Sequence, residues 1–284
     1  MCTVSALGKG VAFHKMQGCG NDFVIIDNRE LRLPVEHMRE WAIKVCRKCF
    51  GVGADGLIFL EQAPAGSGAD VLWHFYNADG SRAEMCGNGA RCASKLSSLL
   101  GLAGKSHVLS TDAGPVACEV LDNGQVKVRL TPATDLRPGQ ELDAAGQKLT
   151  VHFVNTGVPH AVVFLQDVSL ADVKRLGNAV RFHEAFAPKG TNANFVQVKD
   201  SGHLLLRTYE RGVEDETYAC GTGACASAVI AHSLGLTGPE VEVTTTGGEV
   251  LGVSLAGGDV YLRGAAEVCF SGQLYPAALG LPGV

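Results

Sequence analysis

The five residues Cys-Gly-X-Gly-Ala occur twice in this chain, at 86–90 within MCGNGARC and at 220–224 within YACGTGAC. A strand-like segment precedes each turn (HFYN before the first, RTYE before the second), and a helix-like segment follows it. The cysteines are 134 residues apart (220 − 86), close to half of the 284-residue chain. Such a spacing predicts an internal duplication and therefore two similar domains built of strands and helices.

Short alternating or apolar runs dominate the rest of the sequence, and Gly, Asn, Asp and Pro separate them, as is typical of strands. These runs predict strands at 11–16, 22–27, 56–60, 71–76, 125–130, 149–154, 160–165, 194–198, 203–209, 240–246 and 259–264. Helical patterns are fewer and predict helices at 35–49, 87–100, 169–176 and 222–235. The last of these is small and apolar on nearly all sides, so we expect it to be buried.

The domain boundary is predicted at the turn-rich stretch 131–146, TPATDLRPGQELDAAG. The fold class is then α/β (α+β), with an N-terminal domain at 1–132 and a C-terminal domain at 133–273. The first domain carries Cys86 and the second Cys220. A tail of about 274–284 is expected to pack back on the first domain.

Charge and hydropathy exclude some classes of partner. The net charge is −5, with acidic and basic residues interspersed, which argues against a nucleic-acid partner. No apolar run reaches membrane-spanning length, and the N-terminus lacks the apolar core of a secretory signal. A cytoplasmic location with no membrane partner is therefore expected, and the ten cysteines should be thiols rather than a disulfide framework.

A cysteine before a glycine-rich helix start suits acid–base chemistry. Glycine lets the backbone approach a ligand, and the free N–H groups of a helix start bind carboxylates and favour a thiolate nearby. Two such turns facing each other across a cleft would place one thiol on each face of an α-carbon. Removing a proton from one face and returning one to the other inverts the centre, which requires one thiolate, one thiol and no cofactor.

Two other interpretations remain open at this stage. Cys86 and Cys220 also suit small packing positions at helix starts. Cys46 and Cys49, in VCRKCF, form a C-x-x-C pair that suggests zinc or redox chemistry, but no second pair has the spacing of a structural zinc site. The pair also lies within the predicted amphipathic helix 35–49, where core packing is favoured. We therefore predict no metal site.

Longer motifs, spread over nearly the whole chain, resemble those of the diaminopimelate epimerase family. The motifs are FHKMQGCGNDFVIIDN (13–28), GVGADGL (51–57), FYNADGSRAEMCGNGARC (75–92), GVPH (157–160), GTNANFVQ (190–197) and YERGVEDETYACGTGACA (209–226). The resemblance implies an isomerase that is independent of pyridoxal phosphate. It would convert LL-2,6-diaminopimelate to the meso form in lysine and peptidoglycan precursor synthesis.

The resemblance also implies a fold and a small-molecule substrate, whereas it leaves the oligomeric state open. The expected fold has two pseudo-symmetric domains, each a curved, mostly antiparallel sheet wrapped around a central helix, with the active site in the cleft between them. The expected partner is the small-molecule substrate, and the oligomer considered is a homodimer.

Site residues follow from the same motifs. Cys86 and Cys220 would be the two catalytic bases, while His160 and Glu210 would bias which thiol is ionised, and Glu210 would also contact substrate. The reacting amino-acid end would be bound by Asn21, Gly87, Asn88, Gly221 and Thr222. The distal end would be bound by Asn77, Asn192 and Arg211.

Each of these assignments has a structural alternative. His160 also suits a satisfied strand histidine, and Glu210 with Arg211 a surface ion pair. Asn21 and Asn77 also suit plain turns, which asparagine favours.

The chain departs from the family pattern in three places. Val158 stands where many members have Asn, Gly56 stands where many have Gln, and the loop RGVEDETYAC is one residue longer than the commonest form. None of these touches the two cysteines, so they bear on substrate breadth rather than on the reaction. The rival function is a related racemase of another amino acid, such as glutamate or histidine. Arg211 favours a substrate with a second charged end.

Overall fold

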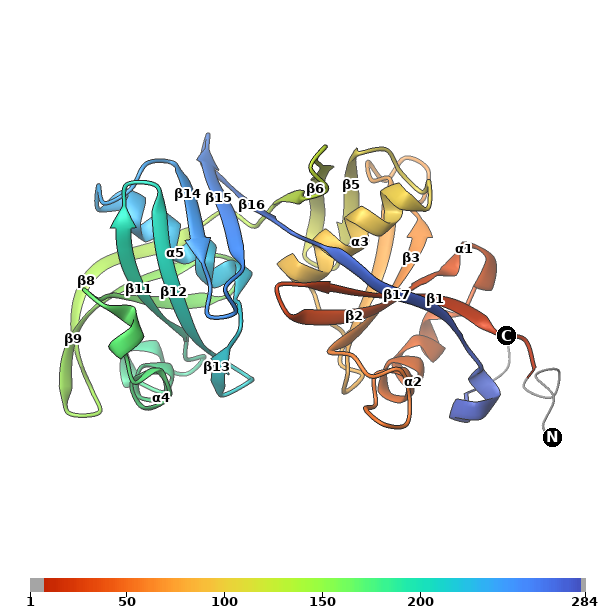
Figure 1. Cartoon of the computed structure of the whole chain (residues 1–284), viewed down its shortest axis with the longest axis horizontal. Coiled ribbons are helices and arrows are strands. Elements are labelled where there is room, and N and C mark those ends of the chain that lie inside the picture. The colour runs from red at the N-terminus through yellow and green to blue at the C-terminus, as the bar shows by residue number, and fades with distance from the viewer. Residues whose placement is uncertain (1–7, 282–284) are drawn as a thin grey trace. The chain divides into compact units, whose positions relative to one another are not determined.

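The computed structural model describes residues 8–281, which form a mixed α/β architecture made mostly of strands, with five α-helices in that range (Figure 1). The described chain divides into two compact units. Unit 1 contains the described residues up to Val128 and those from Ala265 onward, and unit 2 contains Arg129–Gly264.

The elements of unit 1 are β1 (Val11–Gly18), β2 (Asn21–Asp27), α1 (Asn28–Leu31), α2 (Val35–Val45), β3 (Gly56–Gln62), β4 (Val71–Asn77), α3 (Gly87–Leu99), β5 (Ser106–Thr111), β6 (Gly114–Val120), β7 (Val126–Arg129), β17 (Glu267–Leu274) and the 3₁₀ helix η4 (Pro276–Leu279). The last residue of β7 is the first residue of unit 2.

The elements of unit 2 are β8 (Thr134–Ala144), β9 (Gln147–Asn155), β10 (Pro159–Phe164), η2 (Val168–Leu170), α4 (Val173–Arg181), η3 (Glu184–Phe186), β11 (Asn192–Asp200), β12 (His203–Glu210), β13 (Asp215–Thr217), α5 (Gly221–Ser233), β14 (Glu240–Thr244), β15 (Val250–Ala256) and β16 (Asp259–Gly264). Short strand β13 folds back antiparallel on β12.

The two units repeat one order of strand pairing. In unit 1 the neighbours run β17–β1–β2–β3–β4–β5–β6–β7, and in unit 2 they run β8–β9–β10–β11–β12–β14–β15–β16. In both series the pairings are antiparallel except the third and the fifth, which are parallel. Each parallel pair is joined by a crossover that contains a helix, as parallel strands require.

Helices α3 and α5 are the buried crossovers. α3 contacts β1, β2, β3, β5 and β6, and α5 contacts the strands of unit 2 from β9 to β16 except β13 (Figure 1). Nine of the thirteen residues of α5 are buried, and most of them are Gly, Ala, Ser or Cys, so the strands approach the helix closely. This confirms the burial predicted for 222–235.

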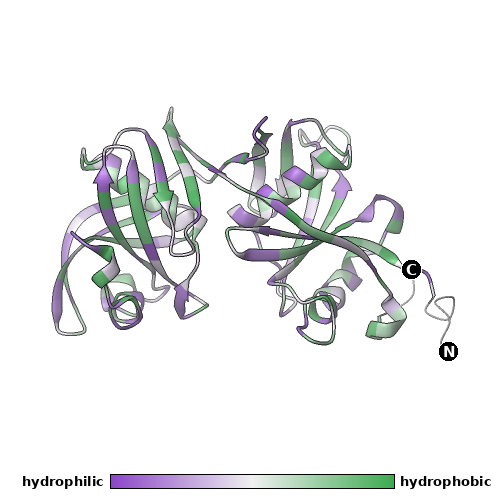
Figure 2. Cartoon of the chain, viewed as in Figure 1, coloured by the Kyte–Doolittle hydropathy of each residue, from purple (hydrophilic) through white to green (hydrophobic). Residues whose placement is uncertain are grey.

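Helices α2 and α4 cover the strands with one face only. α2 buries Met38, Trp41, Ala42 and Val45, which recur at helical spacing on one side, and these side chains join the core of unit 1. α4 contributes in the same way to the core of unit 2. Along the strands of both units, hydrophobic and hydrophilic residues alternate in many places, as expected for sheets with one buried face (Figure 2).

Several sequence predictions of element bounds were wrong. The helix predicted at 35–49 ends at Val45, because the chain turns back on its C-terminus and Gly53 N donates to Val45 O at 3.1 Å. The helix predicted at 169–176 begins only at Val173, after Asp172 caps it by accepting from Arg175 N at 3.2 Å. The predicted strands are all present, but β5, β6, β8, β13, β15 and β17 were missed.

The predicted domain junction also differs from the structure. Residues 134–144 of that turn-rich stretch form strand β8, which pairs with β9 and buries Leu142 and Ala144. At the other end, 267–273 was assigned to the second domain, whereas β17 pairs with β1 in unit 1. β17 stands first in the strand order of unit 1, as β8 stands first in that of unit 2. The predicted boundary differs because the hydrogen bonds of β17 to β1 place residues 267–273 in unit 1.

The C-terminal tail continues from β17. Leu274 and Leu281 belong to the core of unit 1, and Lys44 Nζ donates to Gly280 O at 2.8 Å. Residues 282–284 of the predicted tail, and 1–7 of the N-terminal segment in which no secretory signal was found, lie outside the described residues. Over residues 8–281, no helix combines the length and apolar character needed to cross a membrane.

Candidate active site

The first cysteine turn lies in unit 1. Cys86 is half-buried and is the N-cap of α3, with extended backbone (φ −147°, ψ 120°), while its carbonyl accepts from Ala90 N at 2.8 Å. Gly89 N lies 3.5 Å from Cys86 Sγ and donates toward it. A side chain that caps a helix faces the free N–H groups of the first turn. The thiol and the anion-binding end of α3 therefore face the same space.

Asn21 lies beside this thiol. Cys86 Sγ is 3.5 Å from Asn21 Oδ1, and Asn21 Nδ2 donates to Asp55 Oδ2 at 2.7 Å. Asp55 also accepts from Asp22 N at 3.2 Å, while its own backbone N–H donates to Asp22 O at 3.0 Å. Asn21 therefore has specific polar partners on both sides and is more than a turn former. Asp55 was not among the predicted site residues.

A second residue missed by the sequence analysis is Arg91, which is completely buried within α3. Its guanidinium donates to Asn88 Oδ1 at 2.9 Å, to Gly87 O at 3.3 Å and to Ala265 O at 3.2 Å, and it lies 3.2 Å from Cys19 Sγ. These contacts hold the two predicted turn residues Gly87 and Asn88 in place. A single arginine in a helix of small residues was the available signal.

The distal-end residue predicted in unit 1 is Asn77, at the end of β4. It is exposed, its Nδ2 donates to Ser81 Oγ at 3.0 Å, and its backbone N–H donates to Ser81 O. Asn77 pairs across the sheet with Gly56. A Cβ at Gly56 would lie 2.6 Å from the Phe75 ring, so this chain accommodates the departure at Gly56 by filling the space with Phe75.

The second cysteine turn lies in unit 2. Cys220 is 6% exposed and is the N-cap of α5, again with extended backbone (φ −123°, ψ 106°). Its Sγ is 3.6 Å from Thr222 Oγ1, and its carbonyl accepts from Ala224 N at 2.9 Å. Thr156 Oγ1 donates to Thr222 O at 3.1 Å, which fixes the first turn of α5 against the end of β9. The predicted residues Gly221 and Thr222 are thus adjacent to the thiol.

His160, on β10, is completely buried. Burial, and secondly the charge of Arg211, lower the pKa of His160 to about 3, so the imidazole is neutral near pH 7. Its Nδ1 is 3.1 Å from Asn194 Nδ2, and Asn194 also donates to Ala161 O at 2.9 Å. Thr208 Oγ1 donates to Asn194 Oδ1 at 3.0 Å, which fixes the orientation of that amide.

This orientation selects the tautomer of His160. An amide N–H faces Nδ1, so Nδ1 accepts and the ring proton is on Nε2. Within residues 8–281, Nε2 has no hydrogen-bond partner, and a buried donor without a partner is rare. Asn194 is therefore a further site residue that the sequence analysis missed.

Asn192 and Arg211 connect three strands of unit 2. Asn192 is buried and lies opposite His160 in the parallel pair β10–β11. Its Oδ1 accepts from Arg211 N at 2.8 Å, and its Nδ2 donates to Pro159 O at 3.1 Å. The half-buried Arg211 follows Glu210, the last residue of β12, and donates from its guanidinium to Lys189 O at 3.2 Å.

The C-x-x-C pair does not form a joint site. Cys46 is buried, and burial raises its pKa to about 12, whereas Cys49 is exposed in a turn with φ 67°. The prediction that both lie inside one helix was wrong, because the helix ends at Val45. Among residues 8–281, no three or more His, Cys, Asp or Glu side chains are grouped so as to hold a metal ion.

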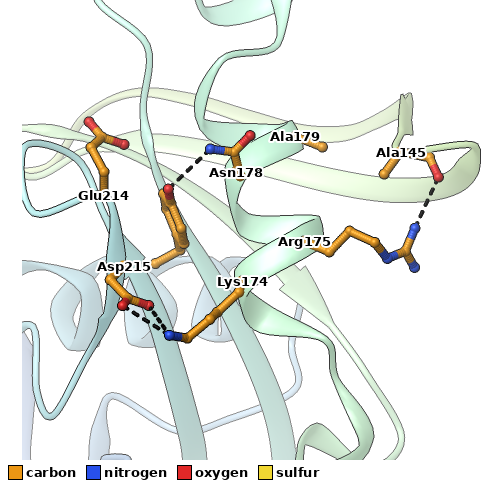
Figure 3. A pocket seen from close by; sticks show the side chains of 8 residues that line it. Ala145, Lys174, Arg175, Asn178, Ala179, Glu214 and Asp215 are labelled. Carbon is orange, nitrogen blue, oxygen red and sulfur yellow. Dashed lines mark hydrogen bonds and ion pairs between the residues drawn. The ribbon is translucent and has the colours of Figure 1, made fainter.

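Figure 3 shows a pocket on unit 2 that is lined in part by residues of α4. Its lining is Ala145, Lys174, Arg175, Asn178, Ala179, Tyr209, Glu214 and Asp215. Tyr209 packs against Gly177 of α4, whereas the next residue, Thr208, bonds to Asn194, which lies against Gly223 of α5. Since neighbouring strand residues face opposite sides of a sheet, the pocket lies on the α4 side and Cys220 on the α5 side.

Solved structures identify the class of fold. A phenazine biosynthesis protein of the PhzF family from Bacillus anthracis aligns with a TM-score of 0.72 at 16% identity, covering 94% of this chain and 99% of that one. A hydroxyproline epimerase from Agrobacterium vitis aligns with a TM-score of 0.66 at 16% identity, covering 96% of this chain and 95% of that one. At these identities the likeness shows a shared fold.

The sequence narrows this class to one family. The profile of the diaminopimelate epimerase family matches residues 13–136 and 152–268. Curated diaminopimelate epimerases from Aquifex aeolicus and Hydrogenobaculum sp. are 45% and 43% identical, each over 92% of this chain and 97% of the relative. The protein from Archaeoglobus fulgidus with the same name is 41% identical, over 93% of this chain and 96% of its own length. The chain belongs to the diaminopimelate epimerase family.

Proposed function

We propose that this chain is an isomerase that converts LL-2,6-diaminopimelate to meso-diaminopimelate without a cofactor, in lysine and peptidoglycan precursor synthesis. Family membership over most of the chain and near full-length relatives that carry this name support the proposal. The observation that carries it is that two cysteines, Cys86 and Cys220, occupy the same N-cap position of two buried helices. A homodimer and a cytoplasmic location stay predictions.

The repeated architecture supports descent from a duplicated half. Both units follow the same order of parallel and antiparallel pairings, and each places its cysteine helix in the crossover of the fifth pairing. We infer that the units are pseudo-symmetric domains, each a curved, mostly antiparallel sheet around a central helix. The reaction itself requires that both cysteine turns reach the same α-carbon, one on each face.

The proposed chemistry uses two bases. The thiolate of one cysteine takes the α-proton, so the C–H bond breaks, an S–H bond forms and the electron pair stays on carbon. The thiol of the other cysteine then gives its proton to the opposite face and becomes the thiolate. The N–H groups at the starts of α3 and α5 suit the substrate carboxylate, whose negative charge increases as the carbanion forms.

The surrounding residues suit orientation and charge. In our proposal Asn21, Gly87, Asn88, Gly221 and Thr222 bind the reacting amino-acid end.

The distal amino-acid end carries its own carboxylate, and the Arg211 guanidinium can bind it with two parallel hydrogen bonds. Asn192 supports that residue by accepting from its backbone N–H, and Asn77 completes the distal set. Glu210, together with His160, biases which thiol is ionised and contacts the substrate. His160, being neutral, acts as a donor through Nε2 rather than as a cation.

Isotope incorporation tests the two-base reaction. A thiol carries one proton, so the cysteine that removes the α-proton does not exchange it with solvent before the carbanion collapses, and the opposite thiol delivers a solvent proton. In deuterium oxide, early turnover should therefore place deuterium in the product epimer and little in recovered substrate. Return of the original proton to both epimers indicates one base and contradicts the proposal.

Single cysteine variants provide the matched test. Cys86→Ala and Cys220→Ala should each abolish epimerisation, because each removes the acid or base of one face. Cys225→Ala is the control, because Cys225 is a buried cysteine in the same helix as the second turn but lies beyond its first residues. Near-normal epimerisation by Cys86→Ala or by Cys220→Ala would contradict the two-base mechanism.

A further inference from the structure

We propose that Asp55 is a positioning residue that orients the Asn21 amide so that Cys86 is held as the protonated, proton-donating thiol in the free enzyme. This inference rests on the proposed function, because it assigns a resting protonation state to one of the two bases. Asp55 lies just before β3 and is linked to Cys86 through Asn21, so its proposed action on the thiol is indirect.

The first step of the argument is the orientation of the amide. A carboxylate only accepts hydrogen bonds, so the side of Asn21 that faces Asp55 Oδ2 at 2.7 Å must be the NH₂ group. The carbonyl oxygen Oδ1 is then left on the other side, 3.5 Å from Cys86 Sγ. Without Asp55, the amide is free to turn its NH₂ group toward the sulfur.

Asp55 is itself held rigidly. Its Oδ2 accepts from Asp22 N at 3.2 Å, and its backbone N–H donates to Asp22 O at 3.0 Å and to Asp22 Oδ1 at 2.9 Å. Asp22 is in turn paired with Lys15 at 2.7 Å. The carboxylate that orients Asn21 is therefore fixed to β2, the strand that Asn21 begins.

The second step is the effect on the thiol. A carbonyl oxygen accepts from S–H but repels a thiolate, so Asn21 Oδ1 favours the protonated form of Cys86. Gly89 N donates toward the same sulfur and favours the thiolate. The orientation of the Asn21 amide therefore decides whether that amide presents an acceptor to the thiol, or a donor in addition to Gly89 N.

Other charged and titratable groups surround this turn and are unaffected by the proposed change. On α3 they are the buried Arg91 and Cys92, and in the β1–β2 turn the buried Cys19. Cys269 on β17 interacts electrostatically with Cys92, and Glu84, two residues before Cys86, is exposed. A comparison of variants at Asp55 keeps all of these constant.

The test measures the thiol directly. The rate of Cys86 alkylation by iodoacetamide is followed against pH in the free enzyme, and trypsin then releases residues 83–91, AEMCGNGAR, in which Cys86 is the single cysteine. We expect Asp55→Ala to lower the pH midpoint of alkylation by about half a unit, which is about a threefold rise in thiolate near pH 7. An unchanged midpoint overturns the proposal.

Asp55→Asn separates orientation from charge. An asparagine there can still accept from Asn21 Nδ2 through its own Oδ1 but carries no charge, so we expect its alkylation midpoint to stay near that of the wild type. If Asp55→Asn shifts the midpoint as far as Asp55→Ala does, the effect is the loss of a negative charge, and the proposed role of amide orientation is wrong.

Asp70→Ala is the matched control for structure. Asp70 accepts from Val108 N at 2.8 Å and donates its own N–H to Val108 O at 2.9 Å, the same reciprocal bonding that Asp55 makes with Asp22. Its loss should leave the Cys86 midpoint unchanged, and an equal shift in both variants overturns the proposal. Alkylation needs no turnover, so these results can be separated from a test of the proposed function. If the Cys86→Ala enzyme is active, the proposed function is refuted. If the Cys86→Ala enzyme is inactive but Asp55→Ala leaves the alkylation midpoint unshifted, only the role of Asp55 is refuted.

Discussion

The third residue of each cysteine helix is a glycine, and replacing each with alanine tests how far the two turns are equivalent. A Cβ on Gly223 would lie 2.5 Å from Asn194 Oδ1 and 3.2 Å from Cys220 Sγ. A Cβ on Gly89 would have its nearest neighbours at 3.5 Å, an ordinary contact distance. The two glycines occupy the same position in the repeated sequence motif, but the structure has room for a methyl group only at Gly89.

The magnitude follows from what must move. Asn194 is held by Thr208, Ala161 and His160, so it cannot withdraw from a new methyl group without weakening hydrogen bonds that contribute about 1 kcal/mol each. Overpacking a buried site costs about 1–3 kcal/mol, against a gain of up to about 1 kcal/mol when alanine replaces glycine in a helix. Gly223→Ala should therefore destabilise by about 1–2 kcal/mol.

Gly89→Ala is the matched variant and should be neutral or stabilising by up to about 1 kcal/mol, since it keeps the N–H that faces Cys86 and gains helix propensity. Urea unfolding followed by circular dichroism gives both stabilities, and the epimerase rate should fall mainly in Gly223→Ala, because that methyl group displaces Cys220 or Asn194. Equal loss of stability in the two variants, or a wild-type midpoint for Gly223→Ala, would refute the reasoning.

Two further predictions concern ionisation and exposure. His160 has a pKa of 6.5 in the unfolded chain and about 3 in the folded chain, so the free energy of unfolding should decrease as the pH falls from about 6.5 to about 3. His160→Gln should therefore flatten the pH dependence of the urea midpoint, and an unaltered dependence would contradict the effect of burial. Cys49 is exposed, whereas Cys46 is buried and has a pKa of about 12. Iodoacetamide should therefore modify Cys49 in the native protein and Cys46 only after unfolding, and separate tryptic peptides report the two rates. Equal rates in the native protein would contradict this arrangement.

Local features of the sequence determined a large part of this protein. The repeated Cys-Gly-X-Gly-Ala turn indicated the place where α3 and α5 begin, because glycines and a capping residue act within one helical turn. The alternating runs predicted eleven strands that are all present, and the small apolar residues of 222–235 predicted a buried helix. These are patterns whose physical cause lies within a few residues.

Tertiary structure decided what depends on residues far apart. β17 joins unit 1 because it pairs with β1, about 250 positions earlier, and no local pattern carries that choice. The contact of Arg91 with Cys19 and Ala265, and the link from Asp55 through Asn21 to Cys86, likewise join separate segments. The two glycines of the repeated turn differ for the same reason: helix propensity is a local property, but the space around a Cβ belongs to whichever strands fold against it.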